Sequence, residues 1–93
     1  MTKILERIDL RSNKENKKEL LEQLEELVND VTERTDDNKI KIYTHYNIGT
    51  DYSVHLLRLI SEEEHLESEL GLRLASSLKE FGLVNHSIWI ENG

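Results

Sequence analysis

Four histidines are the side chains of this sequence whose ordinary pKa lies near neutral pH, so they are the first candidates for acid-base chemistry. Two of them, His45 and His55, lie in stretches that alternate polar and apolar residues. If a turn at Gly49 places Ile48 opposite Tyr52 in an antiparallel hairpin, His45 stands across from His55 on one face. A register shifted by one residue separates the two rings.

We prefer the first register because it gathers apolar residues of both strands on the face that must pack on helices. These residues are Ile40, Ile42, Tyr46, Val54 and Leu56. The two histidines then face the other way, beside Tyr43 and Leu57. Such a histidine is a candidate general base toward a phenolic or enolic substrate. The structural interpretation is that each ring hydrogen-bonds a neighbouring carbonyl or lies at the rim of an interface.

The last apolar stretch contains a polar triplet, Asn85, His86 and Ser87, followed by Trp89. A buried polar group must be hydrogen-bonded, so Asn85 or His86 is expected either to orient a ligand or to form a structural or subunit contact. Trp89 has a large apolar surface, which favours a core or interface position over a stacking platform. The candidate ligand-binding residues are Tyr43, His45, His55, Asn85, His86 and Trp89.

Other chemistries have weaker support. Glu62, His65 and Glu69 share the spacing of one helix face, but a single Glu-x-x-His is more simply a solvated acidic helix start, and we assign no metal site. The chain contains no Gly-x-Ser-x-Gly motif and no glycine-rich phosphate loop. We expect no cofactor, and no catalytic residue can be assigned.

The elements that would position these residues follow from hydrophobic periodicity. Strands are predicted over residues 4–10, 39–48, 52–60 and 83–90. A first helix begins at the capping-box pattern of residues 12–15, ends near residues 35–38, and carries one apolar stripe: Leu20, Leu21, Leu24, Leu27, Val28 and Val31. A second helix begins at Ser61 or Ser68 and runs to Phe81, with Gly82 as a left-handed cap.

Composition limits the partners. The 93 residues fit one domain, residues 1–93, and 19 acidic against 12 basic side chains give a formal charge of −7, which disfavours nucleic acid and anionic membranes. The sequence has no cysteine, and its first ten residues lack the apolar core of a signal peptide. We therefore expect a cytoplasmic protein with no membrane span.

The predicted order is strand, helix, strand, strand, helix, strand. It indicates an α+β protein of the ferredoxin-like type, a four-stranded antiparallel sheet with both helices on one face. The other face would carry Tyr43, Leu57, Leu59 or Trp89, and a large exposed apolar patch of this kind usually marks an interface. We expect a homodimer that closes sheet against sheet.

This order, the length, and the apolar strand Tyr52 to Ile60 resemble the dimeric α/β barrel superfamily, which includes the antibiotic-biosynthesis-monooxygenase-like proteins. The resemblance covers nearly the whole chain and concerns pattern, not a specific motif. It implies two sheets packed around a cavity, and some family members oxidise aromatic polyketides without a cofactor. The tryptophan that those enzymes often have at the end of the third strand is replaced here by Arg58-Leu59-Ile60.

Three functions remain open. The first is a homodimeric module that binds a small apolar or aromatic molecule between the paired sheets. The second is a cofactor-free monooxygenase or isomerase that uses the same cavity on an aromatic or enolic substrate. The third is an assembly protein whose sheet face serves only for packing.

Overall fold

The computed structural model describes residues 2–13, 17–32, 39–61 and 68–92. The elements are strand β1 (Thr2–Ser12), helix α1 (Lys17–Thr32), strands β2 (Lys39–Thr44) and β3 (Asp51–Ile60), helix α2 (Glu69–Leu78), a 3-10 turn (Lys79–Phe81) and strand β4 (Gly82–Ile90). The predicted order of strands and helices is confirmed. The chain is an α+β protein.

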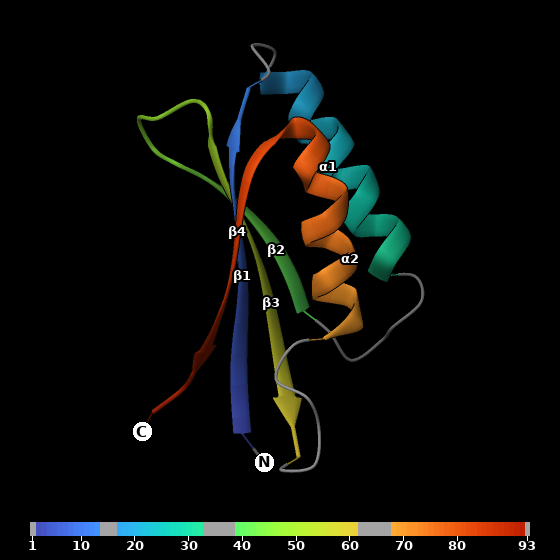
Figure 1. Ribbon diagram of the computed structural model, residues 1–93, viewed down its shortest axis with the longest axis vertical. Coiled ribbons are helices and arrows are strands. Elements are labelled where there is room, and N and C mark those ends of the chain that lie inside the picture. Colours follow the sequence, from blue (N-terminus) through green and yellow to red (C-terminus); the bar gives the residue numbers. More distant parts are fainter. Residues whose placement is uncertain (1, 14–16, 33–38, 62–67, 93) are drawn as a thin grey trace.

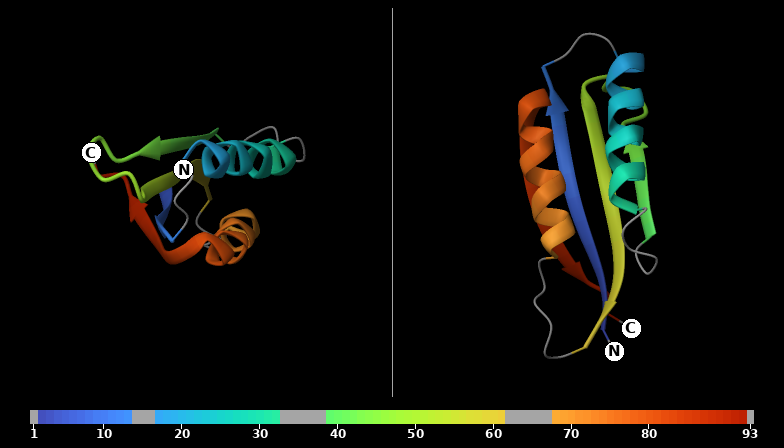
Figure 2. Two further views of the ribbon diagram at one scale, coloured as in Figure 1. Left: turned by 90° about the horizontal axis from the view of Figure 1, so that it is seen from above. Right: turned by 90° about the vertical axis from the view of Figure 1, so that its right-hand side faces the viewer.

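The strands form one antiparallel sheet in the order β2-β3-β1-β4. Both helices lie on the same side of this sheet (Figure 1). Helix α2 runs over β1 and β4, whereas α1 lies beside β2 (Figure 2). This arrangement is compatible with a ferredoxin-like fold, and neither of the described helices lies on the second face of the sheet. We call this second face the open face.

The core lies between the sheet and the helices. Alternate residues of the two central strands point into it, because successive strand side chains face opposite sides. Its buried members include Ile8, Leu10, Val54, Leu56, Leu20, Leu24, Val28, Leu74 and Leu78. The stripe predicted for the first helix is therefore the face that α1 packs on the sheet, as far as its residues are described.

The predicted register of β2 and β3 is wrong. Lys41, not His45, stands opposite His55, and Ile42 stands opposite Val54. Strand β2 ends at Thr44, before the positions that the longer predicted strand assigned to it. The shift is an even number of residues, so the residues that remain in β2 and β3 keep their predicted faces although their partners change.

The chain between β2 and β3 explains the shift. The backbone N–H groups of Asn47 and Ile48 donate to Nδ1 of His45, at 3.3 and 3.2 Å, which folds these residues into a wider turn than the one predicted at Gly49. Tyr46 consequently leaves the sheet and is 92% exposed, so its predicted place in the core is wrong.

Helix α2 begins after Ser68, whose backbone is extended and whose hydroxyl accepts a hydrogen bond of 2.8 Å from the N–H of Gly71. This selects the second of the two predicted helix starts, whereas residues 62–67, which follow Ser61, lie outside the described part. The helix ends at Leu78, earlier than predicted. Gly82 is not its left-handed cap: with φ 158° and ψ −151° it begins β4, where a Cβ atom would overlap the carbonyl of Arg11.

The predicted start of the first helix lies only partly within the described residues. Ser12 is the last residue of β1, and residues 14–16 of the capping-box pattern lie outside the described residues. The described part of α1 begins at Lys17.

Candidate functional site

Large apolar side chains are exposed on the open face. Leu57 and Leu59 of β3, Trp89 of β4 and Tyr43 of β2 are all exposed. Leu5 of β1 stands between Leu57 and Trp89, so one apolar row crosses three neighbouring strands. Within the described residues, no other element covers this side of β3, which explains the exposure of Leu57 and Leu59 in a single chain.

A groove of about 580 Å³ lies at the other end of the same face. Three of the candidate residues line it: Tyr43, His45 and Asn85. Leu83 contributes an apolar wall from β4. The sheet register explains this meeting, since Tyr43 stands opposite Ser53, and Asn85 stands opposite Asp9, in one row across the four strands.

Two ion pairs, Arg7 with Asp9 and Arg11 with Asp51, line the groove. Asp9 accepts hydrogen bonds from Arg7, at 3.0 Å, and from the Ser53 hydroxyl, at 2.8 Å. Arg11 binds Asp51 through two nitrogens, at 3.1 and 3.3 Å. The hydrogen bond from Arg11 lowers the pKa of the Asp51 carboxyl, and the same bond raises the pKa of Arg11. Each carboxylate is thus matched by a guanidinium.

His55 and Tyr43 form an aromatic pair beside this groove. Their ring centroids are 4.4 Å apart with an angle of 41° between the planes. Burial lowers the pKa of His55, the positive charge of Arg7 lowers it further, and Asp9 acts in the opposite direction. His55 is therefore neutral at pH 7 and can accept a proton, which is the state that a general base needs.

His45 serves the turn through one ring nitrogen. Its Nδ1 accepts the two backbone hydrogen bonds described above, so in the neutral ring the proton is on Nε2. The ring also stacks on Tyr46, with centroids 5.1 Å apart. His45 follows the end of β2 and lines the groove, and it is not the cross-strand neighbour of His55, which stands opposite Lys41.

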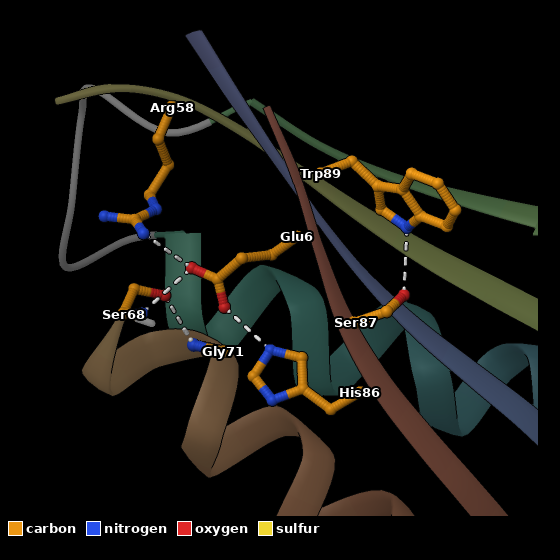
Figure 3. Close-up of polar contacts among 7 residues, drawn as sticks. All are labelled: Glu6, Arg58, Ser68, Gly71, His86, Ser87 and Trp89. Atoms are coloured by element: carbon orange, nitrogen blue, oxygen red, sulfur yellow. Dashed lines mark hydrogen bonds and ion pairs between the residues drawn. The ribbon is translucent and has the colours of Figure 1, made fainter. Parts of the chain in front are cut away.

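His86 faces the helices. Its Nε2 lies 2.9 Å from Oε2 of Glu6, a residue with a side-chain exposure of 0%. Oε1 of Glu6 lies 2.9 Å from Arg58 and accepts a 2.9 Å hydrogen bond from the backbone N–H of Ser68. We call Glu6, Arg58, His86 and Ser68 the Glu6 cluster; it joins three strands to the start of α2 (Figure 3).

The side chains of Trp89 and His86 lie on opposite sides of β4 (Figure 3). Its indole N–H donates to the Ser87 hydroxyl at 3.0 Å, which leaves the apolar ring exposed. The structure thus divides the candidates. Tyr43, His45 and Asn85 share the groove, His55 is beside it, Trp89 is at the far end of the face, and His86 belongs to the Glu6 cluster.

Sequence reasoning missed the charged residues of the Glu6 cluster and of the groove. Glu6 is a charged residue on the side of β1 that is otherwise apolar. A charge in that position is the sequence signal of a buried, partnered carboxylate. Arg7, Asp9 and Arg11 lie on the opposite parity, where charged residues are ordinary, so nothing distinguished them. The candidate metal residues Glu62 and His65 lie outside the described part of the chain.

No family model matches the chain, and neither a curated protein nor a solved structure shows significant similarity to it. The resemblance to the dimeric α/β barrel proteins therefore rests on the element order, the chain length and the apolar strand β3 alone. None of the helices in the described residues has the length and apolar character to cross a membrane.

Proposed function

We propose that the chain is a homodimeric binding module, in which the open faces of two ferredoxin-like subunits pack together as in a dimeric α/β barrel. A small, neutral, largely apolar or aromatic molecule would bind in the groove between them. The observation that carries this proposal is the row Leu57, Leu5 and Trp89 on a sheet face that no other described element covers. A second copy is the simplest cover, because two-fold dimers are the commonest oligomers.

The groove chemistry supports a neutral ligand. The guanidinium groups of Arg7 and Arg11 are matched by Asp9 and Asp51, so the groove offers no excess charge to an ion. Tyr43 supplies an aromatic surface, while Asn85 supplies an amide that can both donate and accept. Few polar groups around an apolar surface are typical of small-molecule sites.

A cofactor-free monooxygenase or isomerase is the second candidate, and one observation favours it. His55 is neutral at pH 7 and lies against Tyr43, so it could take a proton from a phenolic or enolic ligand held on that ring. The catalytic function needs His55, whereas simple binding needs only Tyr43 and the groove.

Binding is tested with 2-naphthol as the probe, followed by chemical shifts of the backbone amides in the labelled protein. We expect shifts at groove residues and a loss of affinity of at least tenfold in Tyr43→Ala, because the aromatic surface is removed. Ser77→Ala, on an exposed position of α2, is the matched control. Equal affinity in Tyr43→Ala and in the control would contradict the proposed site.

The dimer is tested by sedimentation of the natural chain and of Leu59→Glu. Leu59 is exposed in a single chain, so the substitution leaves the fold intact, but it places a charge between the proposed sheets. We expect Leu59→Glu to reduce the mass of the assembly. An unchanged mass would remove the face-to-face contact from the proposal.

A further inference from the structure

Strand β4 is an unprotected edge of the sheet. Natural edge strands are commonly kept from pairing by lysine, proline, bulges or short length. The other edge, β2, has six residues and includes Lys39 and Lys41, whereas β4 has nine residues and contains no lysine, arginine, aspartate or glutamate. Among the described residues, β4 pairs only with β1.

The free hydrogen-bonding groups of this edge can be assigned. Bonds from Glu91 N–H to the Lys3 carbonyl and from Asn13 N–H to the Phe81 carbonyl fix the phase of the β1/β4 ladder at both ends. Because bonded and non-bonded pairs alternate in an antiparallel ladder, the odd-numbered residues of β4 bond to β1. The backbone groups of Val84, His86 and Ile88 therefore point outward.

The sequence of β4 is symmetric in character about its central residue, His86. Read outward in both directions, Ser87 matches Asn85, Ile88 matches Val84, and Trp89 matches Leu83. An antiparallel pair of identical strands centred on His86 would place each residue opposite its match. The same register gives the full overlap of Gly82–Ile90, and it pairs outward-pointing groups with each other, with Val84 opposite Ile88.

The side chains at the two ends of β4 would also gain a partner. Leu83 is 76% exposed and Trp89 is 54% exposed, and both lie on the open face. The centred register places them directly opposite each other across the two-fold axis, which covers both.

Helix α2 presents a matching surface on the other side of the sheet. Leu70 packs against the core that includes α1, and Leu72 lies on the opposite flank of α2, where it is 48% exposed. Since α2 lies over β1 and β4, pairing of two β4 strands about 4.8 Å apart would place the two α2 helices about 10 Å apart, a normal packing distance. Leu72 would then face its symmetry mate.

We propose that β4 is an interaction surface for a second copy of this chain, with two β4 strands paired antiparallel about His86 into one continuous sheet. This contact is separate from the face-to-face contact, and both together would assemble four chains. It places the partner's Trp89 beside Leu83, which lines the groove. The pairing itself does not depend on the proposed function; only its contribution to the groove does.

The register is tested by cross-linking, since the natural chain has no cysteine. Asn85 and the partner's Ser87 would form a non-bonded pair with Cα atoms about 4.5 Å apart, within the range of about 4.4–6.8 Å for a disulfide. We expect the double variant Asn85→Cys/Ser87→Cys to form a covalent dimer on oxidation. Each single variant should form no covalent dimer, because the cysteines of its two chains would be diagonal neighbours about 7–8 Å apart. Equal cross-linking in a single variant would overturn the register.

The contact is tested by sedimentation of Leu72→Glu, which lies on the helix side and cannot touch a face-to-face partner. We expect the natural chain to sediment as four chains of 10.9 kDa each, and Leu72→Glu as two. Leu59→Glu should also give two chains, held by β4. If Leu59→Glu changes nothing and Leu72→Glu halves the mass, the edge contact stands and the face-to-face dimer fails. A monomeric natural chain, or an unchanged Leu72→Glu mass, would overturn the edge contact.

Discussion

Glu6 is a fully buried carboxylate with three polar partners. A carboxylate in the core is tolerated only when its oxygens are partnered, and here Arg58, His86 and the Ser68 N–H supply the partners. The burial of this residue on the helix side also explains why His86 does not reach the groove. The polar triplet of β4 is divided by strand alternation, with His86 inward and its neighbours Asn85 and Ser87 outward.

Glu6→Gln should destabilise the protein by about 3 kcal/mol, because it removes the charge of the buried carboxylate that pairs with Arg58. The measurement is the free energy of unfolding in urea. Glu69→Gln is the control: it breaks the exposed pair with Arg73 and should cost less than about 1 kcal/mol. Equal effects of the two substitutions would show that the Glu6 cluster does not hold the sheet and α2 together.

The pKa of His55 gives the protein a dependence on pH. Because its pKa in the folded chain is below the ordinary 6.5, the unfolded chain binds a proton first as the pH falls. Above pH 6.5 the protonation of His55 should therefore have no effect on stability. The free energy of unfolding should decrease as the pH falls from 6.5 through the lower pKa of the folded state. NMR titration of the His55 ring should give a midpoint below 6.5, and His55→Gln should weaken the pH dependence. A midpoint at or above 6.5 would contradict the burial of this ring.

At the scale of elements, α2 is attached to the sheet through a close contact between Gly71 and Glu6. A Cβ atom at Gly71 would overlap the Glu6 carboxylate. Glycine at this position therefore allows the start of the helix to approach β1, and the approach brings the Ser68 N–H to the carboxylate. The contact between α2 and β1 therefore needs the glycine, the helix start at Ser68 and the inward-facing side chain of Glu6 together.

Gly71→Ala should reverse the usual effect of this substitution. Alanine normally favours a helix by about 1 kcal/mol over glycine, but here the overlap should destabilise the protein by about 1–3 kcal/mol. Gly49→Ala is the control, since a Cβ atom there meets nothing within 4 Å. Thermal unfolding of both variants measures the difference, and a stabilised Gly71→Ala would show that α2 can move away from β1 at little cost.

At the scale of the whole molecule, both proposed contacts cover Trp89. It is the only tryptophan, and its ring is exposed in a single chain. Dilution should therefore shift its fluorescence emission to longer wavelength as the assembly dissociates. Leu59→Glu and Leu72→Glu should show part of this shift without dilution, because each removes one contact. Emission that does not depend on concentration or on these variants would contradict assembly through either surface.

Much of the fold was determined by local sequence. The stripe of α1, the alternation of the strands and the order of elements were all predicted, because hydrophobic periodicity sets which face of each element is buried. The common face of Tyr43 and His55 in the sheet was also predicted correctly. Periodicity fixes the face of a strand residue, but it does not fix which residue of a neighbouring strand stands opposite.

Only the tertiary structure decided which residues of different elements lie next to each other. The turn that His45 folds through its ring moved the β2/β3 register by an even number of residues and separated His45 from His55. The Glu6 cluster joins residues 62 and 80 positions apart in the chain, which no local pattern encodes. The groove has the same origin: its pairs meet because β1 lies between β3 and β4, and strand order is set by how the whole core packs.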